Sequence, residues 1–173
     1  MAVDREIVYS GQTIDELISL ESDFDAFEIL FALETELSKK AAVKDVTTAE
    51  AYVLAIQALR REVDNGGYDQ FFVNSSVEFA PIVVAALKAI GCDRIAEVTS
   101  RAISALGTTN PDSIAEIIAD EDAERETVFA ACDDAFYELA GFAHESDLEA
   151  KLLAFVKANR EWMDPRPADL NAP

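Results

Sequence analysis

Basic side chains are scarce in this sequence. Its 173 residues include 14 lysines and arginines against 34 aspartates and glutamates, which gives a formal net charge of −20 at pH 7. A surface of this sign repels the phosphates of nucleic acids and the anionic headgroups of membrane lipids. We therefore expect no direct binding to nucleic acid and no membrane association. The charge favours a basic protein as the partner.

Residues that commonly hold metals or perform catalysis are also few. His144 is the only histidine, so a histidine-based zinc site or a Ser-His-Asp triad has little to build on. The two cysteines, Cys92 and Cys132, fall in helical patterns and are predicted to be reduced core thiols. The acidic run 120–126 lacks the central glycine and the terminal glutamate of a calcium loop. We expect no metal, no cofactor and no enzymatic activity.

Long hydrophobic runs are missing as well. The longest, Phe79 to Leu87, is too short to span a bilayer and contains Pro81. Residues 1–6 do not show the basic start and apolar stretch of a secretory signal. A cytoplasmic location is therefore expected.

Glycine (6) and proline (5) are rare, whereas half of the residues are hydrophobic. Disordered acidic chains contain fewer hydrophobic residues, so this chain is expected to fold. The apolar residues recur with helical periodicity nearly throughout, and no alternating pattern predicts a strand. We predict an all-α fold: a single compact domain of seven or eight helices over residues 1–163, followed by a Pro-rich extended tail at residues 164–173.

Local signals predict where the helices lie. The expected helices span about residues 22–40, 48–65, 81–91, 93–106, 122–142 and 146–162, and one more begins at 110–112. Thr47 or Thr48 can cap the helix at residues 48–65. Gly107 is expected to close the helix at residues 93–106. Ser75 and Glu78 have the spacing of a capping box that would open a short turn.

The first of these helices has an apolar face. One set of residues has the spacing of a single buried stripe: Phe24, Phe27, Leu30, Phe31 and Leu37.

The acidic residues are segregated along the chain. Residues 1–38 carry a net charge of −9 and residues 112–149 carry −12, whereas residues 39–111 are neutral and residues 150–173 carry +1. This segregation has three interpretations, which the charge alone leaves open. The acids can form a solvated surface that aids solubility, a surface for a basic partner, or a metal or catalytic site.

Within the second acidic block, the spacing of the acids predicts stripes. On the helix after Pro111, Asp112, Glu116 and Asp120 recur every four residues, so they would lie about 6 Å apart along one helix face. Like charges at this spacing repel each other. The next helix is expected to carry four acids on the side away from Phe129: Glu126, Asp133, Asp134 and Glu138.

A distinctive string occupies residues 65–75. It has the form Asn-Gly-Gly-aromatic-x-Gln-aromatic-aromatic-x-Asn-Ser, and an acid-aromatic-Ala-Pro step follows at residues 78–81. The pattern resembles the DNA mimic protein 19 family, also known as the domain of unknown function 4375. The string itself predicts a structural corner, in which the glycines allow positive φ, the aromatic rings refill the core and the amides bond turn backbone groups. Its residues are Asn65, Gly66, Gly67, Tyr68, Gln70, Phe71, Phe72, Asn74 and Ser75.

The resemblance implies a function that composition does not show. It implies an acidic, mostly helical homodimer whose carboxylates stand in for DNA phosphates. Such a protein occupies the DNA-binding face of a helix-turn-helix repressor and so relieves repression. The candidate phosphate-mimicking residues are Asp112, Glu116, Asp120, Glu121, Asp122, Glu124, Glu126, Asp133, Asp134 and Glu138, supported by Asp15, Glu16, Glu21, Asp23, Asp25, Glu28, Glu34 and Glu36.

Two other functions remain open. An immunity or antitoxin-like protein that neutralises a basic nuclease would use the same electrostatics. An enzyme would place its chemistry in the corner at residues 65–75.

Overall fold

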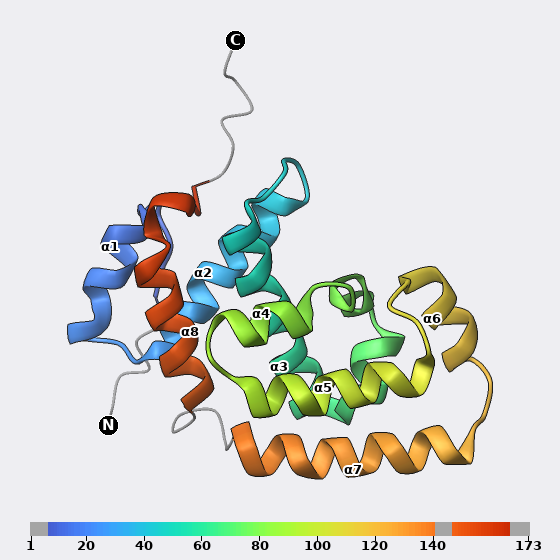
Figure 1. Ribbon diagram of the computed structural model, residues 1–173. Coiled ribbons are helices and arrows are strands. Elements are labelled where there is room, and N and C mark those ends of the chain that lie inside the picture. Colours follow the sequence, from blue (N-terminus) through green and yellow to red (C-terminus); the bar gives the residue numbers. More distant parts are fainter. Residues whose placement is uncertain (1–6, 141–146, 167–173) are drawn as a thin grey trace.

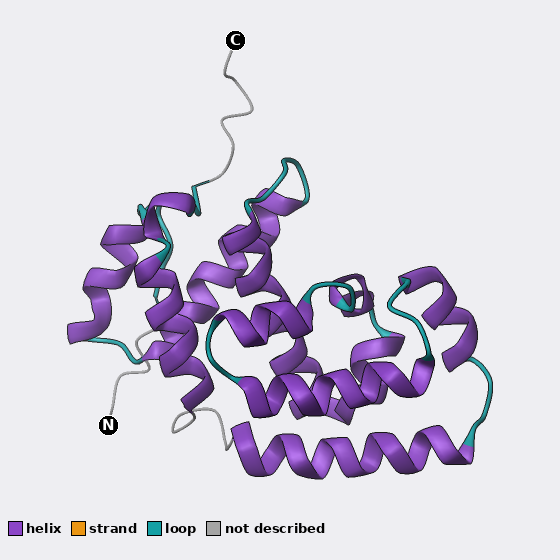
Figure 2. Ribbon diagram, in the orientation of Figure 1, coloured by secondary structure: helices purple, strands orange, loops and turns teal. Residues whose placement is uncertain are grey.

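The computed structural model describes residues 7–140 and 147–166, and within them the fold is all-α, as predicted (Figures 1 and 2). These described residues form eight α-helices and three short 3-10 helices, without a strand. The elements in order are α1 Ile14–Ser19, η1 Leu20–Ser22, α2 Ala26–Ala41, α3 Thr48–Val73, η2 Ser75–Phe79, α4 Val83–Ala89, α5 Asp93–Leu106, α6 Pro111–Ile118, α7 Ala123–Ala140, α8 Asp147–Ala158 and η3 Arg160–Trp162.

Helix α3 lies at the centre of the molecule and contacts helices on both sides of it. It packs against α2 and α8 toward one end, and against α4, α6, α7 and η2 toward the other (Figure 1). Helix α5 packs between α4 and α7. The core of buried side chains is continuous from α1 to α8. The acidic helices α6 and α7 are therefore attached to the central helix directly.

Side-chain caps start several of the helices. Capping boxes join Thr13 to Glu16 at α1 and Thr47 to Glu50 at α3, and each satisfies backbone N–H groups that the helix leaves free. Asn110 caps α6 and is followed by a proline in its first turn. Gly107 closes α5 with a φ of 68°, as predicted.

In the N-terminal half, one helix was not predicted and two local predictions were wrong. Helix α1 was not predicted, because its six residues bury only Ile14 and Leu17 and so show no periodicity. The inward face of α2 runs through Leu30, Leu33 and Leu37, and Phe31, about 100° from Leu30 around the axis, is 51% exposed. Ser75 and Glu78 form no capping box, since the cap position of η2 is Asn74 and no side chain caps this element.

A buried ion pair ties the end of the described chain to the fold. Lys40 Nζ lies 2.6 Å from Glu50 Oε1, and both side chains are buried. The same Glu50 oxygen accepts the backbone N–H of Asp164 over 2.8 Å, and Lys40 donates to the Asp164 carbonyl over 3.1 Å. Residues 164–166 are non-helical, as predicted, but they pack against the helices; residues 167–173 of the predicted tail lie outside the described residues.

Two further predictions concern single features. Cys92 and Cys132 are both buried thiols, as predicted. Across the described part of the chain, no helix combines the length and the apolar character needed to cross a membrane.

Candidate acidic interaction surface

Helix α6 is amphipathic in the way its sequence predicts. Ile114 is fully buried, while Asp112 and Glu116 are exposed on the opposite side. The helix ends at Ile118, however, so Asp120 does not continue the predicted stripe. Asp120 lies instead in the connection to α7, where it is exposed together with the neighbouring acids.

The acids of the connection are attached to the start of α7. Asp122 Oδ1 accepts the backbone N–H groups of Glu124 and Arg125 over 3.0 and 3.1 Å, so this carboxylate caps the helix. Negative charge at a helix N-terminus is favourable because it faces the positive end of the helix dipole. The cap and the dipole offset part of the repulsion within the four acids of residues 120–124.

Arg125 is the only cation of the sequence between residues 112 and 149, and it does not neutralise these acids. Its side chain is buried. Nη1 donates to the backbone carbonyl of Ile117 over 2.9 Å, and Nη2 donates to the carbonyl of Asp120. The guanidinium therefore satisfies the end of α6 and joins it to α7, rather than pairing with a carboxylate.

Helix α7 presents three of its four predicted acids to solvent. Glu126, Asp134 and Glu138 are exposed, and Phe129 and Phe136 on the other side are buried. The fourth, Asp133, is half-buried, and its Oδ1 accepts the backbone N–H of Tyr68 over 2.7 Å. Burial, together with the charges of neighbouring aspartates, raises the pKa of the Asp133 carboxyl, although the Tyr68 bond opposes the shift. The prediction that Asp133 faces outward was wrong.

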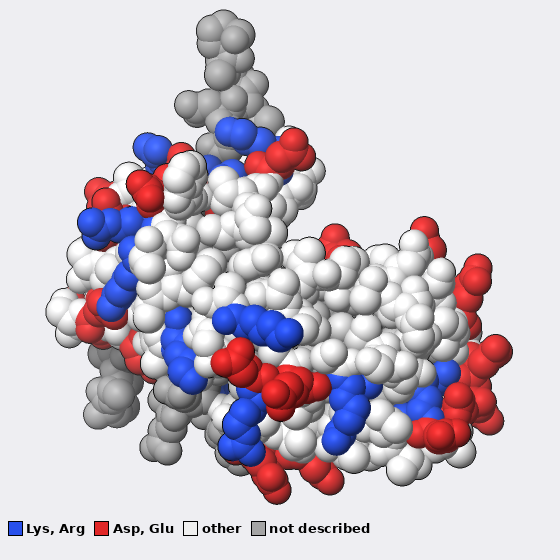
Figure 3. All heavy atoms as spheres, in the orientation of Figure 1, with Lys and Arg blue, Asp and Glu red and all other residues white. Residues whose placement is uncertain are grey.

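The remaining acids form what we call the α6–α7 acidic surface. None of its members takes part in an ion pair with any residue that the structure describes, although Asp122 caps α7. Figure 3 shows acidic atoms gathered at the right-hand end of the molecule, where α6 and the α6–α7 connection lie. The members, all exposed, are Asp112, Glu116, Asp120, Glu121, Asp122, Glu124, Glu126, Asp134 and Glu138.

The N-terminal acids are arranged differently, because most of them already have partners. Four are in ion pairs: Asp15 with Arg160 at 3.7 Å, Glu21 with Lys157 at 2.5 Å, Glu34 with Arg61, and Glu36 with Lys39 at 2.6 Å.

Three other N-terminal acids act locally in helix capping. Glu16 and Thr13 form the capping box of α1, and its hydrogen bonds lower the pKa of the Glu16 carboxyl. Asp25 and Glu28 form the equivalent box at α2. Asp23 is exposed and accepts the hydroxyl of Ser22 over 3.0 Å. The first acidic block therefore has four carboxylates in ion pairs, whereas the α6–α7 acidic surface has none within the described residues.

The string at residues 65–75 forms a structural corner, as predicted. The backbone leaves the helical region at Gly66 and at Gly67, whose φ is 79°, and α3 resumes in a new direction. Beyond the corner, Tyr68, Phe71 and Phe72 are buried, and Tyr68 Oη lies 2.7 Å from Thr99 Oγ1.

The amides of this corner do not bond the backbone as predicted. Asn74 Nδ2 donates to Glu62 Oε2 over 2.7 Å, and Ser76 Oγ donates to the other Glu62 oxygen over 2.9 Å. The exposed Asn65 and the half-buried Gln70 make no side-chain hydrogen bond within the described residues, and Ser75 is exposed. Glu62 thus accepts both the Asn74 amide and the Ser76 hydroxyl and closes the corner.

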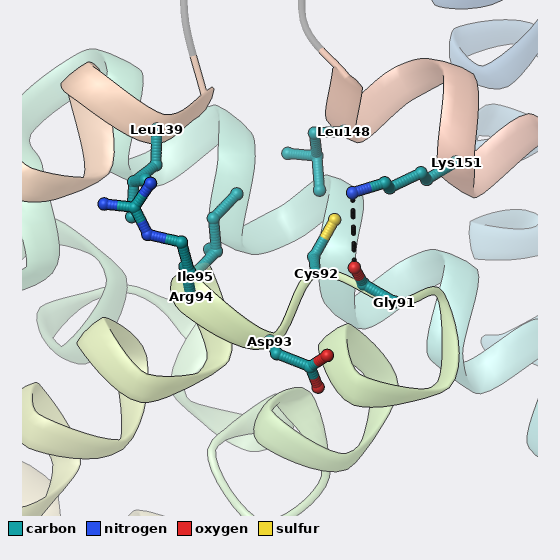
Figure 4. A pocket seen from close by; sticks show the side chains of 8 residues that line it. All are labelled: Gly91, Cys92, Asp93, Arg94, Ile95, Leu139, Leu148 and Lys151. Atoms are coloured by element: carbon teal, nitrogen blue, oxygen red, sulfur yellow. Dashed lines mark hydrogen bonds between the residues drawn. The ribbon is translucent and has the colours of Figure 1, made fainter.

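Away from the acidic surface, a hollow of about 320 Å³ lies between α5, the end of α7 and α8 (Figure 4). Leu139, Leu148 and Ile95 line it, and Lys151 Nζ donates to the Gly91 carbonyl over 3.2 Å at its edge. Only one acid, Asp93, lines this hollow, so it does not extend the acidic surface. Elsewhere too, the described residues contain no group of three or more His, Cys, Asp or Glu side chains placed to hold a metal ion.

The corner and the α6–α7 acidic surface both lie within a match to one protein family. A family model described as DMP19-like protein matches residues 44–159, more than half of the chain, which confirms the resemblance drawn from residues 65–81. The matched range contains the whole α6–α7 acidic surface and the corner, whereas the N-terminal acids lie outside it. No curated protein and no solved structure matches the chain.

Proposed function

The chain belongs to the DMP19-like protein family, and from this membership we propose that it acts as a DNA mimic. The α6–α7 acidic surface occupies the DNA-binding face of a basic protein, in the first instance a helix-turn-helix transcriptional repressor. Binding prevents the repressor from reaching its operator and relieves repression.

The observation that carries this proposal is the uncompensated state of the acids on α6, on α7 and in their connection. Nine exposed carboxylates without an ion pair carry the charge of about 15 Å of duplex, at one phosphate per ~1.7 Å of axis. Their backbone is fixed by the Asp122 cap and by the bonds of Arg125. Fixed charges need less ordering on binding than charges on a disordered tail.

Electrostatics also sets how such a complex would form. Lysines and arginines of the partner, which would otherwise bind DNA phosphates, would bind the carboxylates and displace counterions. The affinity between the two proteins would therefore fall as the salt concentration rises. A dense acidic surface would steer a basic partner and speed association. The neutral surface beside the acids would then discriminate between partners of similar charge.

An electrophoretic competition tests the proposal. Each helix-turn-helix regulator encoded in the same genome is purified and bound to a labelled duplex of its own operator at low salt. Addition of the protein should release the duplex from at least one regulator, and 0.5 M salt should abolish the complex between the two proteins. If every regulator stays on its operator at low salt, the proposal is wrong.

The same surface would fit a basic nuclease, as in an immunity or antitoxin-like protein. That function would give protection from a toxin in a cleavage assay and no release of a regulator. We favour the DNA mimic because the family match covers the acidic surface.

The proposal includes a homodimer and no enzymatic activity. The buried rings of the corner and the bonds to Glu62 support a structural role for residues 65–75. Sedimentation equilibrium of the purified chain tests the dimer. Replacement of Asn65 by alanine tests the enzyme alternative, because a catalytic corner would lose activity without loss of fold.

A further inference from the structure

The corner in α3 and the inner face of α7 are in contact along their length. Phe72 stacks on Phe129 with ring centroids 5.4 Å apart, and Tyr68 meets Phe136 edge to face at 6.0 Å. The next residue of α7, Tyr137, donates from its Oη to the Val63 carbonyl over 2.5 Å. The α7 residues involved recur at helical spacing, so a single stripe of this helix lies against the corner.

Asp133 is the polar contact at the centre of this stripe. Its Oδ1 accepts the Tyr68 N–H, which is the first backbone donor after the two glycines. A Cβ atom at Gly67 would lie 2.4 to 2.9 Å from the three atoms of the Asp133 carboxylate, so only glycine leaves room for this contact. The positive φ of Gly67 independently requires glycine. The corner and Asp133 are therefore fitted to each other.

We propose that the corner at residues 65–75, through the bond between Tyr68 N–H and Asp133, fixes the rotation of α7 about its own axis and so determines which of its carboxylates face the partner. Asp133 is a positioning residue on this account, and its charge does not contact the partner. The inference rests on the proposed function for its biological meaning, but its geometry can be tested without a partner.

Helix geometry makes this rotation matter. Successive residues of an α-helix are about 100° apart, so a turn of one residue would exchange the anchored Asp133 with the exposed Asp134. Burial of apolar surface is not itself directional, so it selects one rotation of α7 less sharply than a hydrogen bond does. A hydrogen bond to a carboxylate is directional and stronger than a neutral one, so it can select one rotation.

Distances between two nitroxide labels test the rotation directly. We would attach the labels at Ala130→Cys on α7 and Ala154→Cys on α8, which are both exposed positions, while the native cysteines are buried. The parent chain should give one narrow distance distribution. Asp133→Asn keeps an acceptor for the Tyr68 N–H and should leave the distribution unchanged, whereas Asp133→Ala should broaden or shift it.

Asp134→Ala, at the neighbouring exposed position, is the matched control and should leave the distribution unchanged. Gly67→Ala should shift it in the same sense as Asp133→Ala. If Gly67→Ala does not fold, Asp133→Ala still decides the matter. A distribution for Asp133→Ala equal to that of the parent chain would overturn the inference.

Binding distinguishes this inference from the proposed function. Against a regulator that the protein releases from its operator, Asp133→Asn should bind within about twofold of the parent chain, because no exposed charge is lost. Asp133→Ala should bind at least about fivefold more weakly than Asp133→Asn. A failure to release any regulator, with the distance changes as expected, would refute the DNA mimic and leave the positioning role intact. Equal weakening by both variants would show that the Asp133 charge itself contacts the partner.

Discussion

Arg125 Nη1 donates to the carbonyl of Ile117 over 2.9 Å. The only lysine or arginine of the second acidic block therefore bonds the backbone of α6 instead of a carboxylate. The last carbonyls of a helix have no partner within the helix, and they carry the negative end of its dipole. A buried guanidinium donates to two carbonyls at once, at Ile117 in the last turn of α6 and at Asp120 in the connection to α7. This single relationship keeps α6 joined to α7 and leaves the carboxylates without a counter-charge.

Replacement of Arg125 by methionine should lower the free energy of unfolding by about 1–3 kcal/mol, because two carbonyls lose their donor. Chemical denaturation measures the change. The control is Arg160→Met, which removes an exposed ion pair with Asp15 and should change the stability by less than about 1 kcal/mol. Equal losses in the two variants would mean that the Arg125 bonds do not stabilise this connection.

Burial raises the pKa of the Asp133 carboxyl above its ordinary value of 3.8. The folded protein therefore holds this proton more tightly than the unfolded chain does. The resulting stability is fully present below pH 3.8 and is lost as the pH rises through the higher pKa of the folded state. Asp133→Asn cannot titrate, so its stability relative to the parent chain should improve as the pH rises through this window.

Urea unfolding of both chains at several pH values between 3 and 7 measures that difference. The amide proton of Tyr68 offers a second signal, since its chemical shift should follow the titration of the carboxylate that it bonds. A stability difference that does not change with pH, or that falls as the pH rises, would contradict the burial of Asp133.

The buried pair of Lys40 and Glu50 should be strongly sensitive to the loss of one partner. Lys40→Met leaves the Glu50 carboxylate buried without its cation, and such changes destabilise proteins by about 3–5 kcal/mol. Lys39→Met is the matched control, because the neighbouring Lys39 is 63% exposed in its pair with Glu36 and should contribute less than about 1 kcal/mol. Thermal unfolding of the two variants would contradict this account if their losses were equal.

Much of the fold could be predicted because its signals are local. Gly107 ends α5 and Asn110 starts α6 through contacts within four residues, so the sequence contains both partners of each signal. The family string at residues 65–75 likewise predicted a corner from its glycines. Helix α1 is too short to show apolar periodicity, and the capping box of Thr13 and Glu16 is its only local signal among these residues.

The candidate site could be predicted only in part, because charge along a sequence does not reveal which carboxylates are compensated. Glu21 pairs with Lys157, 136 residues away, and Asp133 bonds Tyr68, 65 residues away. Neither contact has a local signature. The two acidic blocks therefore look alike in sequence and differ in the structure, where mainly the second one is left without partners.

If the protein is a DNA mimic, charge on the α6–α7 acidic surface, rather than net charge, should bind the partner. The most direct test compares two variants that each lose three carboxylates. One carries Glu121→Gln, Asp122→Asn and Glu124→Gln, in which the asparagine can still cap α7. The other carries Asp15→Asn, Glu21→Gln and Asp23→Asn, which lie in the N-terminal block.

Affinity for a regulator that the protein releases from its operator is then measured between 50 and 300 mM salt. The first variant should bind at least about tenfold more weakly at low salt, with a slope of log affinity against log salt that is shallower by up to about three units. The second variant should retain the affinity and the slope of the parent chain. Equal losses in both variants, or a larger loss in the second, would contradict the account.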